Sequence, residues 1–259
     1  MSYVIAIANQ KGGVAKTTST ITLAHALAYR GKRVLTLDLD PQSNLTLYFK
    51  LDPEELEEQQ RTLYWALKKD GFDMKSLIVS GPPDIIPSGP LLEQAEREFL
   101  YEWDSVSFIK DKLKPLHNLY EYILIDCRPT LTLLTVNGLV ASNGVIIPCA
   151  TEYFSVIGIK LLLNTIEEVR QRPNPFLEIL GILPTRYDSR NRHDKDALEE
   201  LFGSFADHYK IFDPINKTTR FNDASVEGRP ILDISPKHSV TENYYKVADF
   251  IIDHYAKRN

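Results

Sequence analysis

A glycine-rich loop between an apolar strand and an amphipathic helix constrains this chain most strongly. The run Tyr3–Ala8 is apolar, the loop Asn9–Ala15 follows it, and a helix-length amphipathic segment begins at Lys16. Glycine permits tight turns in which successive backbone N–H groups point toward one anion. The positive end of the following helix favours the same anion. The order strand, loop, helix therefore predicts a phosphate-binding site; the alternative is a glycine-rich turn beside a solvated lysine.

Apolar runs alternate with helix-length segments along the rest of the chain. The runs are rich in Ile, Leu and Val without polar alternation, which is typical of strands covered on both faces. Strand–helix alternation favours right-handed crossovers, so we predict an α/β fold with a doubly wound, mostly parallel twisted sheet flanked by helices. The predicted strands are Tyr3–Ala8, Arg33–Leu39, Asp84–Pro87, Tyr122–Asp126, Gly144–Pro148 and Glu178–Pro184. The predicted helices cover residues 16–30, 60–69, 90–100, 105–115, 131–141, 155–172, 193–206 and 240–257.

Composition limits the domain count and the kinds of site. The chain has 259 residues, 43% of them hydrophobic, and no linker rich in Gly, Ser or Pro, so we expect one domain over residues 1–259. Cys127 and Cys149 form no CxxC pair, which argues against zinc and iron–sulfur sites and favours a reducing cytoplasm. No apolar run approaches the roughly 20 residues that span a bilayer. A net charge of −5 gives no overall attraction to DNA, so DNA binding would need a local basic patch.

The loop carries the residue types that phosphate and magnesium require. Lys16 is placed to neutralise phosphate charge, and Thr17 to offer its hydroxyl to Mg²⁺. The pattern G-x-x-x-x-G-K-[ST] would need glycine at positions 10 and 15, where this chain has Gln10 and Ala15. If position 15 requires a positive φ, alanine costs about 1 kcal/mol there. The predicted nucleotide ligands in the loop are Lys11, Gly12, Gly13, Val14, Ala15, Lys16, Thr17 and Thr18.

Carboxylates follow two of the predicted strands. Asp38 and Asp40 lie two residues apart at the end of one strand, and alternation places both on one side, beside the phosphate loop. Two carboxylates there suit coordination of Mg²⁺ water and alignment of an attacking water. Asp126 ends the apolar run Tyr122–Asp126 and is placed to hold Mg²⁺ through water. The predicted metal set is Thr17, Asp38 and Asp126; the alternative is that these acids cap turns or helices.

Together these motifs resemble the ParA/MinD family of deviant Walker A P-loop ATPases. The family's loop has lysine, two glycines, any residue, glycine, lysine and threonine, and residues 11–17 match it except at Ala15. The segment Asp38–Gln42 is similar to the family's switch I, Asp-x-Asp-Pro-Gln. Switch II, normally Asp-Cys-Pro-Pro, is similar to Asp126–Pro129, with Arg128 in place of a proline. Segments 134–137, 145–148, 152–154, 179–188 and 228–231 extend the likeness to Soj-type ParA proteins over nearly the whole chain.

The resemblance implies a slow, partner-stimulated ATPase that uses ATP and Mg²⁺. In that family Lys11 matches the signature lysine, which reaches the partner's nucleotide across a homodimer formed in the ATP state. Lys16 and Asp40 would complete the catalytic set, with Asp40 activating water. The dimer would bind DNA without sequence preference, so we expect a cytoplasmic, nucleoid-associated protein without the separate N-terminal DNA-reading domain of longer plasmid forms. A ParB-like or cargo-adaptor protein would stimulate hydrolysis, and the cargo would be a plasmid, a chromosome or a protein assembly such as carboxysomes.

Several basic residues are candidates for DNA or nucleotide contact. Between residues 184 and 230 the chain has eight Lys/Arg but nine Asp/Glu, so composition alone does not force a DNA surface. The resemblance implies DNA contacts at Arg190, Arg192, Lys217 and Arg220, and a base-side contact at Lys217; the alternative for each is solvated surface charge. Arg128 is either a solvated charge or faces nucleotide or partner.

Two other function classes compete with this interpretation. One is a membrane-surface ATPase like MinD, which needs an amphipathic C-terminal anchor. The helix 240–257 is amphipathic, but Asp249 and Asp253 would repel anionic lipid, so we expect a packed helix and no membrane partner. The other is a metabolic P-loop ligase, which would not ordinarily need a lysine acting across a dimer.

Overall fold

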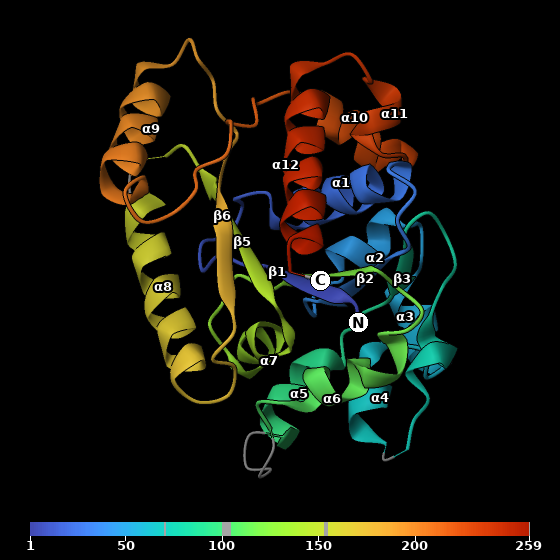
Figure 1. Cartoon of the computed structure of the whole chain (residues 1–259). Coiled ribbons are helices and arrows are strands. Elements are labelled where there is room, and N and C mark those ends of the chain that lie inside the picture. The colour runs from blue at the N-terminus through green and yellow to red at the C-terminus, as the bar shows by residue number, and fades with distance from the viewer. Residues whose placement is uncertain (70, 100–104, 153–154, 259) are drawn as a thin grey trace.

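A computed structural model describes residues 1–69, 71–99, 105–152 and 155–258 and contains a six-stranded, all-parallel sheet (Figure 1). The order across the sheet is β3-β2-β4-β1-β5-β6, which places β1 in the middle. The predicted α/β fold and its six strands are confirmed to within two residues at each end. The strands are β1 (Tyr3–Ile7), β2 (Val34–Leu39), β3 (Asp84–Ile86), β4 (Tyr122–Cys127), β5 (Gly144–Ala150) and β6 (Glu178–Thr185).

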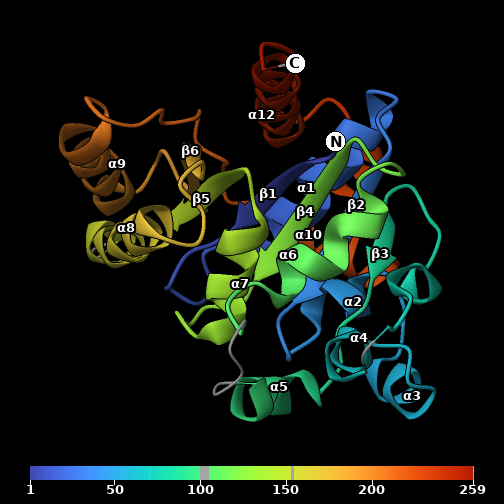
Figure 2. The same ribbon diagram turned by 60° about the horizontal axis from the view of Figure 1, so that its bottom comes forward.

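Helices cover both faces of the sheet (Figure 2). Successive side chains of β1 enter opposite cores, with Val4 and Ala6 in one and Tyr3, Ile5 and Ile7 in the other. The second core is closed by α1 (Lys16–Tyr29), α10 (Arg220–Glu227), α11 (Ile231–Ile234) and α12 (Ser239–Ala256). The first is closed by α4 (Leu63–Lys68), α5 (Leu92–Phe99), α6 (Phe108–Leu113), α7 (Leu133–Ala141), α8 (Ser155–Gln171) and α9 (Arg192–Phe205).

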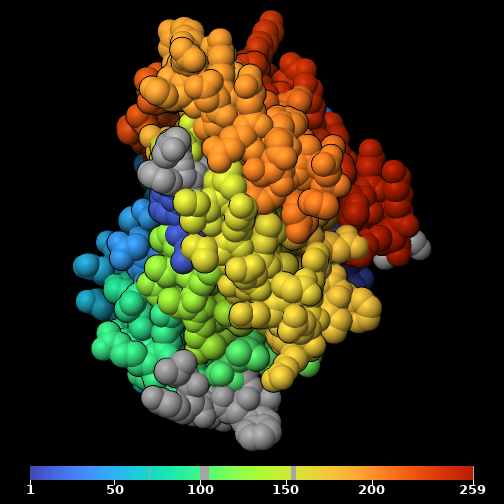
Figure 3. All heavy atoms as spheres, turned by 90° about the vertical axis from the view of Figure 1, so that its left-hand side faces the viewer, coloured from blue at the N-terminus to red at the C-terminus, as the bar shows by residue number. Residues whose placement is uncertain are grey.

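All eight predicted helices are present. The helices that the sequence patterns do not predict are short. These are α2 (Asn44–Tyr48), α3 (Pro53–Glu58), α10 and α11, with single 3-10 turns at Met74–Leu77 and Lys114–Leu116. So few turns give little 3.6-residue periodicity to detect. Leu100, the last residue of one predicted helix, and Tyr153 and Phe154 of the 152–154 motif lie outside the described residues. Helices α8 and α9 together form one end of the molecule, yellow and orange in Figure 3.

The terminal helix α12 buries its apolar side within the protein. Val240, Tyr244, Val247 and Ile251 are buried in the core that α12 shares with α1. Asp249 accepts two hydrogen bonds from the Arg30 guanidinium, at 2.7 and 2.9 Å. The predicted packed helix is therefore confirmed. Among the described residues, the search for a helix with the length and apolarity of a bilayer span finds none.

Parallel pairing brings the ends of the strands to one edge of the sheet. The loop after β1, Asp40 after β2, Asp126 near the end of β4 and Thr185 at the end of β6 all lie at this edge. In the β2–β4 register Asp38 lies directly beside Asp126. Ligands of doubly wound sheets bind at this edge, so the fold places the candidate site here.

A buried histidine links α1 to the segment that follows α2. The ring of His25 stacks on Phe49 with centroids 6.1 Å apart, and burial lowers the pKa of His25 from 6.5 to about 4. As pH falls from about 6.5 toward 4, the unfolded chain binds a proton that the folded chain does not, so stability falls. Between pH 7 and pH 4.5 we expect wild type to lose on the order of 2 kcal/mol more unfolding free energy than His25→Phe.

Urea unfolding at the two pH values measures this difference. His208 is exposed on the surface, so His208→Gln is the matched control and should lose as much stability as wild type. An equal loss in wild type and His25→Phe would contradict the prediction.

Candidate functional site

A large cleft of about 1080 Å³ opens at the carboxyl edge of the sheet. Most of its lining comes from four segments: the phosphate loop and start of α1, the turn after β2 with α2, the turn after β6, and the segment 215–225; Pro129 and Tyr244 also line it. A cleft of this volume is large enough for a nucleotide. The residues that line the cleft in these segments include Gly12, Gly13, Ala15, Lys16, Thr17, Thr18, Asp40, Arg186, Arg190 and Lys217.

The phosphate loop has two residues in the left-handed region. Gly13 has a φ of 73°, and Ala15 has a φ of 63° and a ψ of 36° at the N-cap of α1. Position 15 therefore needs the positive φ that a glycine would adopt without strain. Alanine costs about 1 kcal/mol in this conformation, so the loop is locally strained.

Lys16 lies at the floor of the cleft and is 8% exposed. Its Nζ donates a hydrogen bond to the Lys11 carbonyl oxygen at 3.0 Å. Burial lowers the pKa of Lys16, and the nearby Asp126 carboxylate is the strongest influence in the opposite direction. Among the described residues the ammonium bonds only this neutral carbonyl, so a phosphate would be a better partner for it.

Asp126 has a buried oxygen that suits a cation. The residue is 1% exposed; Oδ1 accepts a hydrogen bond from Thr20 Oγ1 at 3.2 Å, while Oδ2 is buried with no partner among the described residues. Burial and then the neighbouring Asp38 raise the pKa of Asp126 to about 8, and the Thr17 hydroxyl partly opposes this shift. An unpartnered buried carboxylate oxygen beside a threonine hydroxyl fits a magnesium ion or its bound water.

Asp38 and Asp40 have different surroundings. Asp38 is fully buried, and burial raises its pKa to about 7. Its Oδ2 accepts hydrogen bonds from Thr46 N at 2.9 Å and Thr46 Oγ1 at 2.7 Å, and its Oδ1 from Asp40 N at 3.2 Å. Asp40 lines the cleft and accepts a bond from Gln42 N at 3.0 Å. Asp38 therefore shapes the turn that presents Asp40, and its place near the metal stays a prediction.

Lys11 is tied to its own chain near the surface. Its Nζ lies 2.7 Å from Glu152 Oε2, with the two side chains 33% and 51% exposed. The bond to Lys11 holds the pKa of Glu152 below its usual value. An exposed ion pair contributes only about 0.2–1 kcal/mol. Lys11 could therefore leave Glu152 for a stronger anionic partner at little cost.

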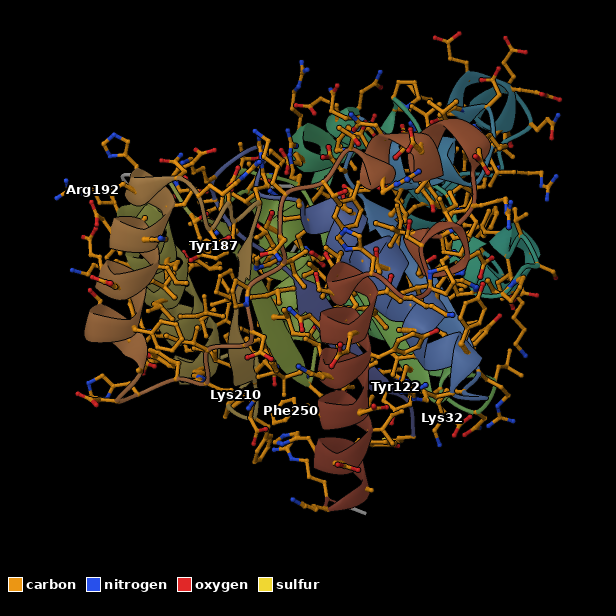
Figure 4. The ribbon with its side chains drawn as sticks, turned by 90° about the horizontal axis from the view of Figure 1, so that it is seen from above. Lys32, Tyr122, Tyr187, Arg192, Lys210 and Phe250 are labelled. Carbon is orange, nitrogen blue, oxygen red and sulfur yellow. The ribbon has the colours of Figure 1, made fainter. Side chains whose placement is uncertain are left out.

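The structure does not bring the four basic candidates together. Arg190 and Lys217 line the cleft, and Arg190 donates two hydrogen bonds to Asp188 at 3.0 and 2.9 Å. Arg220 is outside the cleft lining and lies 3.6 Å from Asp223. Arg192 lies at the outer tip of α9, away from Tyr187 and the sheet (Figure 4). Their contact with DNA stays a prediction.

Arg128 is paired with acidic residues of its own chain. Its side chain is 14% exposed, and its guanidinium lies 3.2 Å from Glu93 and 3.0 Å from Glu96. It is therefore not a solvated charge and does not line the cleft, but ties the segment after β4 to α5, and a contact with a partner stays a prediction. These partners are more than 30 residues away in sequence, so no local pattern indicates them.

Sequence reasoning missed two residues that contact the phosphate loop from another strand. Thr185 Oγ1 donates to the Val14 carbonyl at 3.0 Å, and an Arg186 N–H donates to the Gly13 carbonyl at 2.9 Å. Thr185 ends the apolar strand β6 at the carboxyl edge and Arg186 follows it, and that position is the signal that could have identified them.

The chain matches one protein family and is similar to several known proteins. A family model described as an AAA domain matches residues 2–179. The sporulation initiation inhibitor protein Soj of Bacillus subtilis is 37% identical over 251 residues, covering 96% of this chain and 97% of Soj. The chromosome partitioning protein ParA of Caulobacter vibrioides is 35% identical over 254 residues, covering 96% and 93%. A solved structure of cobyrinic acid a,c-diamide synthase from Mycobacterium smegmatis, with bound ATP analog and magnesium, is 33% identical with a TM-score of 0.85, covering 100% and 98%.

The buried carboxylate of Asp126 should lower the stability of the folded chain while it contributes to magnesium-dependent nucleotide binding. Since its pKa is raised to about 8, this residue costs the folded chain stability as pH rises from about 4 to 8. We expect Asp126→Asn to raise the unfolding free energy at pH 7.5 in EDTA by on the order of 2 kcal/mol. The same variant should weaken magnesium-dependent nucleotide binding at least about tenfold, because a neutral amide is a poorer metal partner.

Urea unfolding and titration with a fluorescent ATP analog measure the two effects. Asp207 is exposed, so Asp207→Asn is the matched control and should change neither quantity. Loss of stability in Asp126→Asn, or unchanged magnesium dependence, would contradict the prediction.

Proposed function

Because the chain belongs to the ParA/MinD family of deviant Walker A P-loop ATPases, we propose that it is an ATP-dependent dimerising switch that positions cargo on DNA. The observation that carries the proposal is the placement of three residues around one cleft. Lys16 and Asp40 line the cleft, and Lys11 lies beside it in an exposed ion pair within its own chain. A lysine held so weakly near the surface suits a contact across a dimer.

The residues of the cleft would bind ATP and direct its hydrolysis. Backbone N–H groups of the phosphate loop and the Lys16 ammonium would bind the phosphates, with Thr17 and Asp126 on the magnesium side. Magnesium, when bound, would neutralise part of the phosphate charge. Asp40 would orient a water for in-line attack on the γ-phosphate, releasing ADP and phosphate. Lys11 of a second copy would complete the site, so hydrolysis would require the dimer.

A connection between the turn after β2 and α10 supports coupling of nucleotide state to DNA binding. Tyr48 at the end of α2 donates a hydrogen bond to the Arg229 carbonyl at 2.7 Å. Lys50 Nζ donates to the carbonyl oxygens of Val226 at 2.9 Å and Ser225 at 3.3 Å, near the end of α10. A rearrangement around Asp40 on ATP binding would therefore shift α10, which carries Arg220. The DNA-binding form would then be the ATP form.

The proposal extends to location and partners. DNA binding without sequence preference would place the protein in the cytoplasm on the nucleoid, and a ParB-like or cargo-adaptor protein would stimulate hydrolysis. Soj and ParA, at 37% and 35% identity, support partition of a chromosome or plasmid as the role. A protein assembly such as a carboxysome is the other cargo class. The gene next to this one would distinguish the cargoes by encoding a centromere-binding partner or a different small adaptor.

The first prediction from this proposal concerns Lys11. Wild type should convert from monomer to dimer with ATP and Mg²⁺, measured by sedimentation velocity with a slowly hydrolysed ATP analog. Lys11→Ala should bind the nucleotide but remain monomeric, and should lose at least about tenfold of its hydrolysis rate, because the partner's phosphate charge is no longer neutralised. Lys75→Ala, at an exposed position outside the cleft lining, is the control and should behave as wild type.

Full dimerisation and hydrolysis by Lys11→Ala would favour the metabolic alternative. The similarity to the cobyrinic acid a,c-diamide synthase of Mycobacterium smegmatis gives an example of such a metabolic enzyme. An ATP-dependent ligase would keep nucleotide binding without a lysine that acts across a dimer.

The second prediction separates DNA from membrane. Plasmid DNA should pellet the wild-type protein with ATP and not with ADP, with a steep loss of binding as salt rises. Arg220→Ala should weaken this binding about threefold to tenfold and lower the salt slope, whereas the exposed control Arg61→Ala should not. Anionic liposomes should pellet neither form, because the apolar side of α12 is buried. DNA binding that ignores ATP, or lipid binding that requires it, would overturn the proposal.

A further inference from the structure

Carbonyl groups of the phosphate loop accept hydrogen bonds from side chains of another segment. A loop that turns its N–H groups toward a phosphate turns carbonyls outward, and buried backbone carbonyls are almost always paired. Two of these carbonyls are bonded by one turn: Val14 O by Thr185 Oγ1 at 3.0 Å and Gly13 O by Arg186 at 2.9 Å. Thr185 ends β6 and Arg186 follows it, and β6 is separated from β1 by β5 in the sheet.

Arg186 has a backbone conformation and a charge environment that suit a residue holding the phosphate loop in place. The two bonds from Thr185 and Arg186 to this loop are called the clamp below. Its φ is 57°, in the left-handed region that non-glycine residues occupy rarely and mostly at functional positions. Arg186 lines the cleft, and no carboxylate in the described part of the chain lies within 4.0 Å of its guanidinium. The positive charge of Arg186 therefore contacts the Gly13 carbonyl of the phosphate loop and forms no ion pair with a described carboxylate.

The loop needs such a restraint because Ala15 is strained. A glycine at position 15 would adopt the left-handed conformation without a steric cost, whereas alanine favours other conformations. We propose that Thr185 and Arg186 are positioning residues that hold the phosphate loop in its nucleotide-binding conformation and offset the strain at Ala15. The proposal rests on the proposed function in taking ATP as the ligand, but the clamp itself exists without nucleotide.

Removing the clamp should lower the population of the binding-competent loop, and the apparent affinity falls by the same factor. We expect Arg186→Gln and Thr185→Val each to weaken binding of a fluorescent ATP analog about tenfold. Arg186→Lys, which keeps a charged donor, should restore affinity to within about threefold of wild type. In an Ala15→Gly background, Arg186→Gln should weaken binding only about twofold, because the loop no longer needs the restraint.

Steady-state kinetics distinguishes positioning from a general structural role. At saturating ATP, kcat of Arg186→Gln should stay within about twofold of wild type while KM rises about tenfold. The urea midpoint should not change, because Arg186 is exposed. Lys195→Gln, an exposed substitution on α9, is the control and should match wild type throughout.

Hydrogen exchange of the 12–16 segment in the nucleotide-free protein tests the clamp without ATP. Exchange should be about tenfold faster in Arg186→Gln and close to wild type when Ala15→Gly is added. Unchanged affinity and exchange in Arg186→Gln would overturn the inference, as would an affinity loss that persists fully in the Ala15→Gly background. If wild type binds no ATP but exchange responds as expected, the proposed function fails and the clamp stands.

Discussion

Parallel pairing of β2, β4 and β1 is the constraint on which the site depends. It places Asp38 beside Asp126 in register and both beneath the loop that follows β1. Burial raises the pKa of both carboxylates, and the neighbouring Asp38 raises that of Asp126 further. The fold tolerates this cost because Thr46 and Thr20 donate hydrogen bonds to the carboxylates. A cation at the Asp126 oxygen that has no hydrogen-bond partner among the described residues would reduce the remaining cost of burying these carboxylates.

The phosphate loop is shaped by elements on both sides of β1. Its two left-handed residues, Gly13 and Ala15, lie between the start of α1 and the turn after β6. A loop with such φ values would not hold one conformation alone, because each left-handed residue has competing conformations of similar free energy. Packing of β5 between β1 and β6 sets the distance over which Thr185 and Arg186 can reach the loop. Preorganisation of the site thus comes from the sheet.

The surfaces around the cleft are linked by few, specific contacts. On one side, Tyr48 and Lys50 join the turn after β2 to the end of α10. On another, Lys11 pairs with Glu152 just before α8. Each contact is exposed and individually weak, which suits a switch, since a ligand can then change the arrangement with a few kcal/mol of differential binding. The buried core beneath them stays constant.

The sequence by itself determined the sheet strands, the phosphate loop and the acids at the strand ends. Those features are local: apolar runs, glycines beside a helix start, and a carboxylate at the end of a strand such as Asp126. Local patterns do not report partners distant in the chain. Only the tertiary structure decided that Arg128 binds α5, that Asp38 bonds Thr46 while Asp40 faces the cleft, and that Arg186 holds the loop. The physical reason is that side-chain pairing depends on strand order and register, which adjacent residues do not encode.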